Sequence, residues 1–328
     1  EVLCDPGLRL DDSFFDRGGT SIRALRLVAR IEETLGVQPT IATLITHPTP
    51  RALAGWMRVS STVAPRAEVV PLNACTERQT PVYCVVGLHA YTALAAGIRR
   101  RPVYGVYVDE ELEFPDDTLT VATLATSYLR AIEGHSAPPK VMLGISFGAF
   151  VAFEMAQQLH ARGTPPDLVV MLDPRLPSTL ESSRVDPLLN LAARIRIAPE
   201  TIPLRAKDLL RRAVTNAEAR VALTPDQELW AAREAAYARA LEAYEPTLRA
   251  YPGLAHVYLA RDDSPARLPK MQANWRSLLG PGSVVEVVPG THGTLLQQPF
   301  VSHISRAIDA TLRRRPSVTI PAAGNTRE

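Results

Sequence analysis

The chain has 328 residues, of which 46% are hydrophobic and 21% charged, and its formal net charge at pH 7 is +2. This composition is typical of a globular protein with one or two domains, and so small a net charge gives no reason to expect a nucleic-acid partner. No apolar run reaches membrane-spanning length, and the N-terminus lacks the basic and then apolar pattern of a signal peptide. We therefore expect partners that are neither nucleic acid nor membrane.

The three cysteines, Cys4, Cys75 and Cys84, are an odd and sparse set. Such usage argues against a disulfide framework and favours a reducing, cytoplasmic location. None of them has metal-ligand spacing with a histidine, so we expect no metal site. The chain begins at Glu1, which is compatible with a piece of a longer protein.

Residues 1–60 predict a small all-α helical bundle. One apolar stripe of helical spacing comprises Ala24, Leu27, Val28, Ile31 and Leu35. Gly36 ends that helix in the usual position for a glycine. Two further helical segments are expected at Ile41–Ile45 and from Arg51 to about Val59.

Ser21 follows two glycines at the start of the long helix. Read by itself, it is a helix cap. The pattern F-F-x-x-G-G-x-S, the helix after it and the segment L-x-x-H-P-T resemble a peptidyl carrier domain of nonribosomal peptide synthetases, over roughly residues 10–57. The resemblance implies that Ser21 carries 4′-phosphopantetheine, attached by a phosphopantetheinyl transferase.

Residues 61–68 are small and unpatterned and predict a linker, followed by an α/β domain over residues 69–312 and a disordered tail over 313–328. The predicted strands are Val82–Val86, Val103–Val108, Lys140–Leu143, Leu168–Leu172, Val257–Ala260 and Val284–Val288. The predicted helices between them include Leu119–Ile132, Ala149–Ala161, Arg267–Leu279 and Phe300–Leu312. This alternation favours a mostly parallel sheet covered on both faces, with the active site at the carboxyl ends of its strands.

The stretch from Val141 to Gly148 carries the strongest motif of the chain, G-x-S-x-G between an apolar strand and an apolar helix. Only glycine allows strand and helix to approach so closely on either side of the turn. Ser146 is then left on a strained corner above a helix N-terminus, which is the setting of a nucleophile. The alternative is a chance match between two core elements.

Ser146, Asp173 and His292 each follow a predicted strand, in the chain order of the α/β hydrolases. In such a triad His292 takes the proton of Ser146, and Asp173 orients the imidazole. Asp173 is otherwise a strand-end turn residue, with Asp109 and Asp262 as alternative acids. The competing histidines are His47, His89, His135, His160, His256 and His303. His292 is favoured because it follows the last strand between two glycines.

The α/β domain resembles the terminal thioesterases of nonribosomal peptide and polyketide synthases. The likeness lies in Pro102–Gly105, Gly144–Glu154, Leu172–Pro177, Ala240–Pro246 and Val288–His292. It implies an oxyanion hole made by the backbone N–H groups of Phe147 and Leu88. Two departures from the family are the loop at residues 85–90, which lacks the usual H-P-x-G-G, and Thr291, where an acidic residue is common.

Residues 180–244 form a long insert with predicted helices at Leu188–Ile197, Ala206–Asn216 and Pro225–Tyr244. By position the insert resembles the lid of these thioesterases, although it can also be a plain structural insertion.

The resemblances together imply a carrier–thioesterase pair that ends a biosynthetic assembly line. The upstream partners would be condensation and adenylation domains, and the substrate an acyl or peptidyl thioester released by hydrolysis or cyclisation. The alternatives are an editing thioesterase and a catalytically inactive domain that only docks the carrier.

Overall fold

The computed structural model describes residues 2–3, 5–19, 21–37, 39–59, 67–75, 77, 79–108, 119–135, 141–180, 225–263 and 265–313. The predicted helices Leu188–Ile197 and Ala206–Asn216 and the tail after Arg313 lie outside these residues, as does most of the predicted linker.

Three helices form the N-terminal unit: α1 (Ser21–Leu35), α2 (Ile41–Thr46) and α3 (Pro50–Val59). Their apolar sides enclose a core that contains Phe14, Ala24, Ile31, Leu44 and Leu53. The predicted bundle is therefore present. One member of the predicted stripe differs, because Leu35 is the last residue of α1 and is 58% exposed.

The two glycines before α1 are required by the turn that leads into the helix. Gly18 has a φ of 89°, a region that favours glycine. A Cβ atom on Gly19 would lie 2.3 Å from the ring of Phe14, which is buried in the bundle core. The G-G pair thus lets the loop close over Phe14 and makes Ser21 the first residue of α1.

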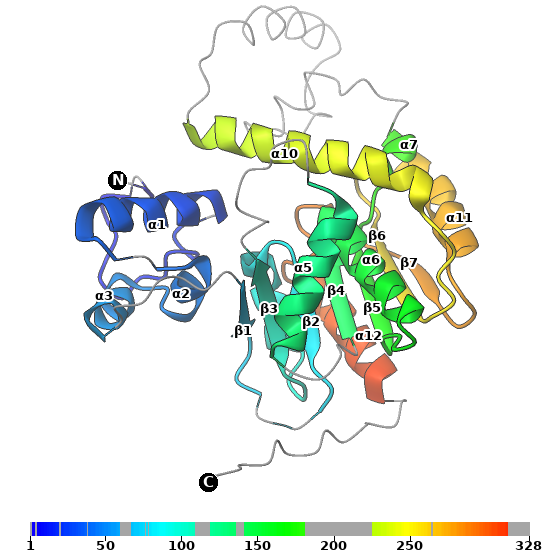
Figure 1. Cartoon of the computed structure of the whole chain (residues 1–328), viewed down its shortest axis with the longest axis horizontal. Coiled ribbons are helices and arrows are strands. Elements are labelled where there is room, and N and C mark those ends of the chain that lie inside the picture. The colour runs from blue at the N-terminus through cyan, green and yellow to red at the C-terminus, as the bar shows by residue number, and fades with distance from the viewer. Residues whose placement is uncertain are drawn as a thin grey trace, which may run out of the picture.

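The second unit is built on a seven-stranded sheet with the order β1-β3-β2-β4-β5-β6-β7 (Figure 1). Its strands are β1 (Ala67–Pro71), β2 (Val82–Val85), β3 (Val103–Val108), β4 (Val141–Ile145), β5 (Leu168–Leu172), β6 (Ala255–Ala260) and β7 (Val284–Val288). β1 is antiparallel to β3, and every other pair is parallel. The carboxyl ends of the six parallel strands consequently open toward one side, where strand-following loops meet.

Helices cover both faces of the sheet, as the fully apolar central strands require. On one face lie α5 (Val121–Glu133), α6 (Phe147–Ala161) and α11 (Leu268–Leu278), which share a core with alternate strand residues. On the other lie α4 (Thr92–Gly97) and α12 (Val301–Arg313), with a core of their own. The predicted α/β-hydrolase architecture is confirmed.

The strand β1 and the helix α4 are among the described elements that the sequence did not predict. β1 contains a proline and a glutamate and pairs only as an edge strand, so its composition resembles a loop. It includes Ala67 and Glu68, which were expected in the linker. The short helix α4 has only six residues, too few to show a helical period.

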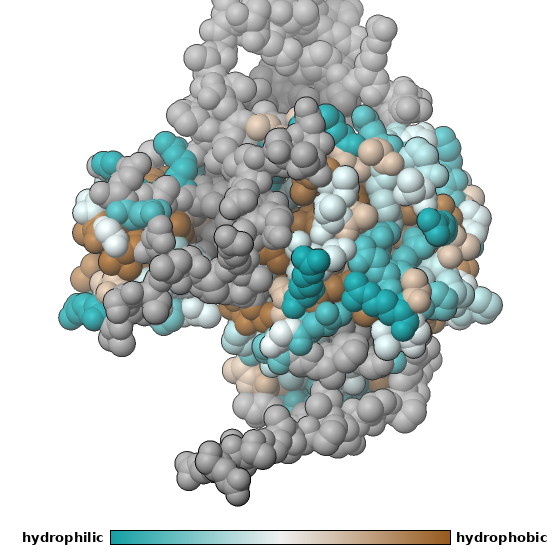
Figure 2. All heavy atoms as spheres, viewed as in Figure 1, coloured by the Kyte–Doolittle hydropathy of each residue, from teal (hydrophilic) through white to brown (hydrophobic). Residues whose placement is uncertain are grey.

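On the face shown in Figure 2, polar and weakly polar residues cover much of the described surface of the larger unit, and hydrophobic residues show on the N-terminal unit. Three of the large exposed hydrophobic residues, Leu8, Leu10 and Leu35, belong to that unit. Among the described helices, none has both the length and the hydropathy needed to cross a membrane.

Candidate active site

The elbow at Ser146 has the backbone that its glycines predict. Ser146 lies between β4 and α6 with φ 56° and ψ −124°, a strained conformation for a residue with a side chain. A Cβ atom on Gly144 would lie 2.0 Å from the carbonyl oxygen of Gly148. The Ser146 side chain makes no cap hydrogen bond with α6. The close approach of strand and helix therefore presents the hydroxyl at the carboxyl edge of the sheet.

The first turn of α6 also packs against the end of β2. A Cβ atom on Gly148 would lie 2.8 Å from the carbonyl oxygen of Val85. The Tyr91 hydroxyl links the two strands, because it donates to Val85 O (2.8 Å) and accepts from Ile145 N (3.0 Å). The loop after β2 is thereby held beside the elbow.

The predicted oxyanion donors lie on these two segments. Phe147 is the first residue of α6, and Leu88 is the first residue of the 3₁₀ helix η1 (Leu88–Tyr91). Val86 N is already engaged, since it donates to the Tyr128 hydroxyl at 3.1 Å. Gly87 turns the chain with φ 79° before Leu88. The pairing of Phe147 and Leu88 as donors stays a prediction.

Asp173 and His292 lie 119 positions apart in the sequence and meet at the carboxyl edge of the sheet. The His292 Nδ1 atom is 2.7 Å from Asp173 Oδ2, and Asp173 Oδ1 accepts from Ala260 N at 3.0 Å. Burial by itself would raise the pKa of the Asp173 carboxyl, but the hydrogen bond from His292 and the charge of Arg175 lower it below the ordinary value. The carboxylate is therefore ionised near neutral pH and can orient the imidazole.

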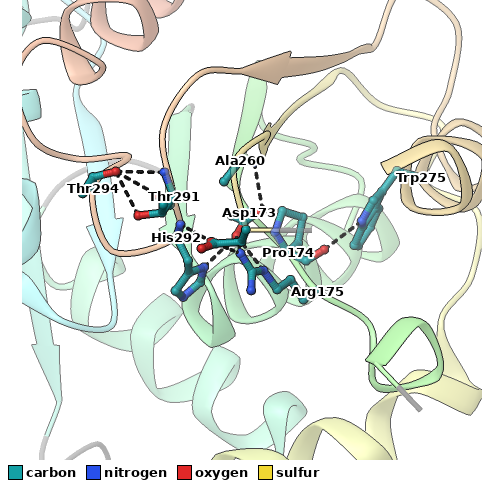
Figure 3. Close-up of polar contacts among 9 residues, drawn as sticks. Asp173, Pro174, Arg175, Ala260, Trp275, Thr291, His292 and Thr294 are labelled. Carbon is teal, nitrogen blue, oxygen red and sulfur yellow. Dashed lines mark hydrogen bonds and ion pairs between the residues drawn. The ribbon is translucent and has the colours of Figure 1, made fainter. Parts of the chain in front are cut away.

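Arg175 contacts the same carboxylate (Figure 3). Its Nε and a terminal nitrogen lie 2.7 Å and 2.6 Å from Asp173 Oδ2. The terminal nitrogen also donates to Asp263, which in turn accepts the backbone N–H of His292. Asp173 is thus shared between an imidazole and a guanidinium, and Asp263 joins the guanidinium to the histidine loop.

The histidine loop has further supports. Asp262, an alternative acid in the sequence prediction, accepts the N–H of Gly290 at 2.8 Å. Thr291 donates its backbone N–H to the hydroxyl of Thr294 at 2.8 Å. The other alternative, Asp109, lies outside the described residues. Of the two acids that can be compared, Asp173 contacts the imidazole and Asp262 holds the loop.

A cavity of about 400 Å³ lies at this edge of the sheet. It is lined by Ser146, Phe147, Phe150, Arg175, Pro177, Glu234, Tyr237, Ala238, Leu241, Glu242 and His292. Among the described histidine side chains, His292 is the one that lines it. The cavity thus brings Ser146 and His292 to one space, with Asp173 buried behind them.

The far wall of the cavity comes from helix α10 (Pro225–Tyr244), whose bounds match the predicted third helix of the insert. α10 runs across the top of the sheet in Figure 1. Tyr237 stacks on Phe147 with ring centroids 4.1 Å apart, directly beside the predicted nucleophile. The C-terminal end is anchored on α6, because the Tyr244 hydroxyl donates to Glu154 at 2.8 Å. This part of the insert covers the site.

Sequence reasoning missed Arg175, Asp263 and Tyr237. A signal for the first two exists, because each follows a parallel strand and such residues converge at one edge. No periodicity marks Tyr237 as a residue that faces the site.

Two segments of the chain match models of known protein families. The family model of the thioesterase domain matches residues 84–312, and that of the phosphopantetheine attachment site matches residues 1–57. Among curated relatives, the chain is 32% identical over 190 residues to a dimodular nonribosomal peptide synthase from Bacillus subtilis, covering 53% of the chain and 8% of the relative. It is 36% identical over 177 residues to an indigoidine synthase from Streptomyces lavendulae, and the match covers 51% of the chain and 14% of the relative. The chain therefore spans a small part of these relatives.

Two solved structures share the fold. A holo four-domain nonribosomal peptide synthetase, AB3403, superposes with a TM-score of 0.56 at 21% identity, covering 94% of this chain and 25% of that one. The thioesterase domain of NocB from the nocardicin cluster superposes with a TM-score of 0.53 at 20% identity, covering 76% of this chain and 100% of that one.

Proposed function

The chain belongs to the thioesterase domain family and carries a phosphopantetheine attachment domain, and from that premise we propose that it releases an acyl chain from its own carrier by Ser146 catalysis. The observation that supports this best is the cavity shared by Ser146 and His292, with Asp173 hydrogen-bonded to the imidazole. The proposal places the pair at the end of a nonribosomal peptide assembly line, after condensation and adenylation domains.

The first step transfers the acyl group to the protein. Ser146 Oγ attacks the carbonyl of the acyl thioester while His292 takes the hydroxyl proton. Asp173 keeps Nδ1 protonated, so that the other ring nitrogen accepts that proton. The carbonyl oxygen becomes negative and accepts from the N–H groups of Phe147 and Leu88. Collapse of this intermediate expels the thiol, which takes the proton back from His292, and leaves an ester on Ser146.

The second step frees the acyl group. Water, or a nucleophile within the acyl chain, attacks the ester carbonyl and gives its proton to His292, which returns it to Ser146 Oγ. Water produces an acid and an internal nucleophile produces a ring. The cavity wall formed by α10 determines which nucleophile reaches the ester in this proposal.

Ser21 is the residue that we propose as the attachment point of 4′-phosphopantetheine. It is the first residue of α1 and comes directly after a turn that depends on Gly18 and Gly19, so the attachment point lies at the start of that helix. The group supplies a thiol on which the acyl chain is carried as a thioester. The experiment is incubation with coenzyme A and a phosphopantetheinyl transferase: the mass should rise by one arm in the wild type and not in Ser21→Ala.

The catalytic proposal is tested by labelling with a fluorophosphonate, which esterifies an activated serine. The wild-type protein should label with one equivalent, Ser146→Ala should not label, and His292→Ala should label slower by several orders of magnitude. Ser302→Ala, a surface serine on α12, is the matched control and should label normally. Equal labelling of wild type and Ser146→Ala would disprove the catalytic role, and an inert wild type would favour a domain that only docks the carrier.

A further inference from the structure

The buried carboxylate that orients His292 is shared with an arginine. Asp173 Oδ2 lies 2.7 Å from His292 Nδ1 and 2.7 Å and 2.6 Å from two guanidinium nitrogens of Arg175. The Asp173 side chain is 1% exposed, whereas those of Arg175 and His292 are 26% and 36% exposed. The imidazole and the guanidinium therefore share one buried carboxylate oxygen, and the chemistry proposed above does not use the guanidinium.

Asp263 fixes the arginine in this place. Its Oδ2 accepts from an Arg175 terminal nitrogen and from the backbone N–H of His292, each at 2.5 Å. One carboxylate oxygen thus ties the guanidinium to the histidine loop. Arg175 and Asp263 follow the neighbouring strands β5 and β6, so the link joins two loops at the carboxyl edge of the sheet.

We propose that Arg175, held by Asp263, is a positioning residue that sets the pH at which His292 becomes an effective base, a role that rests on the catalytic function proposed above. A positive charge that shares Asp173 disfavours a second positive charge on the imidazole.

The charges that act on the imidazole come from every side of the loop. Asp173 and Arg175 follow β5, Asp262 and Asp263 follow β6, and Glu234 acts on His292 from α10 across the cavity. Of these, Arg175 is the cation that shares the carboxylate oxygen with the ring. Its removal leaves Asp173 and Asp263 beside the ring, while Arg261 stays paired with Asp262 and Arg233 stays near Glu234, so the local field then favours the protonated imidazole.

Substitution of Arg175 and substitution of Asp263 should shift the midpoint of the His292 titration in opposite directions. Arg175→Met should raise the midpoint of the His292 ring titration by about one pH unit, the size of a unit charge at about 5 Å in a partly solvated site. Asp263→Asn should lower it by about half a unit, since the amide oxygen still accepts from His292 N while the negative charge is lost. The double variant should lie between the two single variants, about half a unit above the wild-type midpoint, and Arg175→Lys, which keeps the charge, should stay close to the wild type.

The experiment is a nuclear magnetic resonance titration of ¹⁵N-histidine-labelled protein, with the His292→Gln variant assigning the signal. The pH profile of fluorophosphonate labelling is measured in parallel on the same variants. Opposite shifts of the two single variants in both readouts, with the double variant between them, support the proposal. Shifts of the same sign, or midpoints of Arg175→Met and Asp263→Asn within about 0.2 unit of the wild type, overturn it, because a merely structural contact would not move them by charge.

The two readouts keep the two proposals apart. Labelling that does not depend on Ser146 refutes the catalytic function, whatever the ring titration shows. A wild type that labels normally while Arg175→Met leaves the titration unmoved refutes only the role of Arg175. Arg175→Gln, which also removes the charge, provides the second variant if Arg175→Met does not fold.

Discussion

Asp173→Asn is the substitution for which the structure gives the clearest expected result. Asp173 is fully buried and accepts only, from Ala260 N, from His292 Nδ1 and from Arg175. An amide that keeps its oxygen toward Ala260 places an NH₂ group against His292 and Arg175, which are both donors. The neutral imidazole then carries its proton on Nε2 instead of Nδ1, so Nε2 can no longer accept the proton of Ser146.

The magnitude follows from this change of tautomer. A triad in which the carboxylate is replaced by an amide loses up to about ten-thousand-fold in rate, equal to about 5 kcal/mol of transition-state stabilisation. The unpaired donor of Arg175 should also cost about 1–3 kcal/mol of unfolding free energy. For a domain of this size that lowers the melting temperature by roughly 2–10 °C.

The assay is turnover of a small-molecule acyl thioester together with thermal unfolding. Two other carboxylate-to-amide substitutions serve as controls for Asp173→Asn. The first is Glu133→Gln, which changes a surface partner of Arg162 and should behave as wild type. Asp262→Asn keeps an oxygen for Gly290 N and should lose less than about tenfold. Normal turnover by Asp173→Asn, or a larger loss in Asp262→Asn, would refute this reasoning and move the acidic role.

Three further outcomes are expected. Gly144→Ala should abolish labelling of Ser146 and destabilise the fold, because the new Cβ atom would lie 2.0 Å from the carbonyl oxygen of Gly148. The control Gly163→Ala, at a site with open space but a φ of 76°, should lower the unfolding free energy by only about 1 kcal/mol. Equal destabilisation of the two variants in thermal unfolding would contradict the elbow geometry. Tyr244→Phe should lower the unfolding free energy by about 1–2 kcal/mol, because Glu154 Oε2 loses the hydroxyl that donates to it, and hydrogen exchange in α10 should rise. Unchanged exchange would mean that this bond does not anchor the helix. Folding lowers the pKa of Asp173, so its ionised carboxylate should stabilise the fold fully above about pH 4. This stabilisation should vanish as the pH falls through the pKa of Asp173 in the folded state. The difference in unfolding free energy between wild type and Asp173→Asn should therefore narrow only in that acidic window.

Local patterns in the sequence were enough to predict most of the described elements and the elbow at Ser146. Runs such as Leu168–Leu172 are apolar throughout and bounded by polar residues, and the structure has this strand at the predicted bounds. The glycines around Ser146 and before Ser21 carry a steric requirement that is visible without any tertiary contact. Each of these signals is short-ranged, because dihedral preference and side-chain period act over a few residues.

Only the tertiary structure decided which charges meet. Arg175 and Asp263 are 88 positions apart, and nothing in the spacing of either residue indicates its partner. Similarly, β1 is a strand only because β3 offers it an edge, and Tyr237 faces Phe147 only because α10 crosses the cavity. These contacts depend on where loops and helices converge above the sheet, and convergence is a property of the whole packed chain that no local window contains.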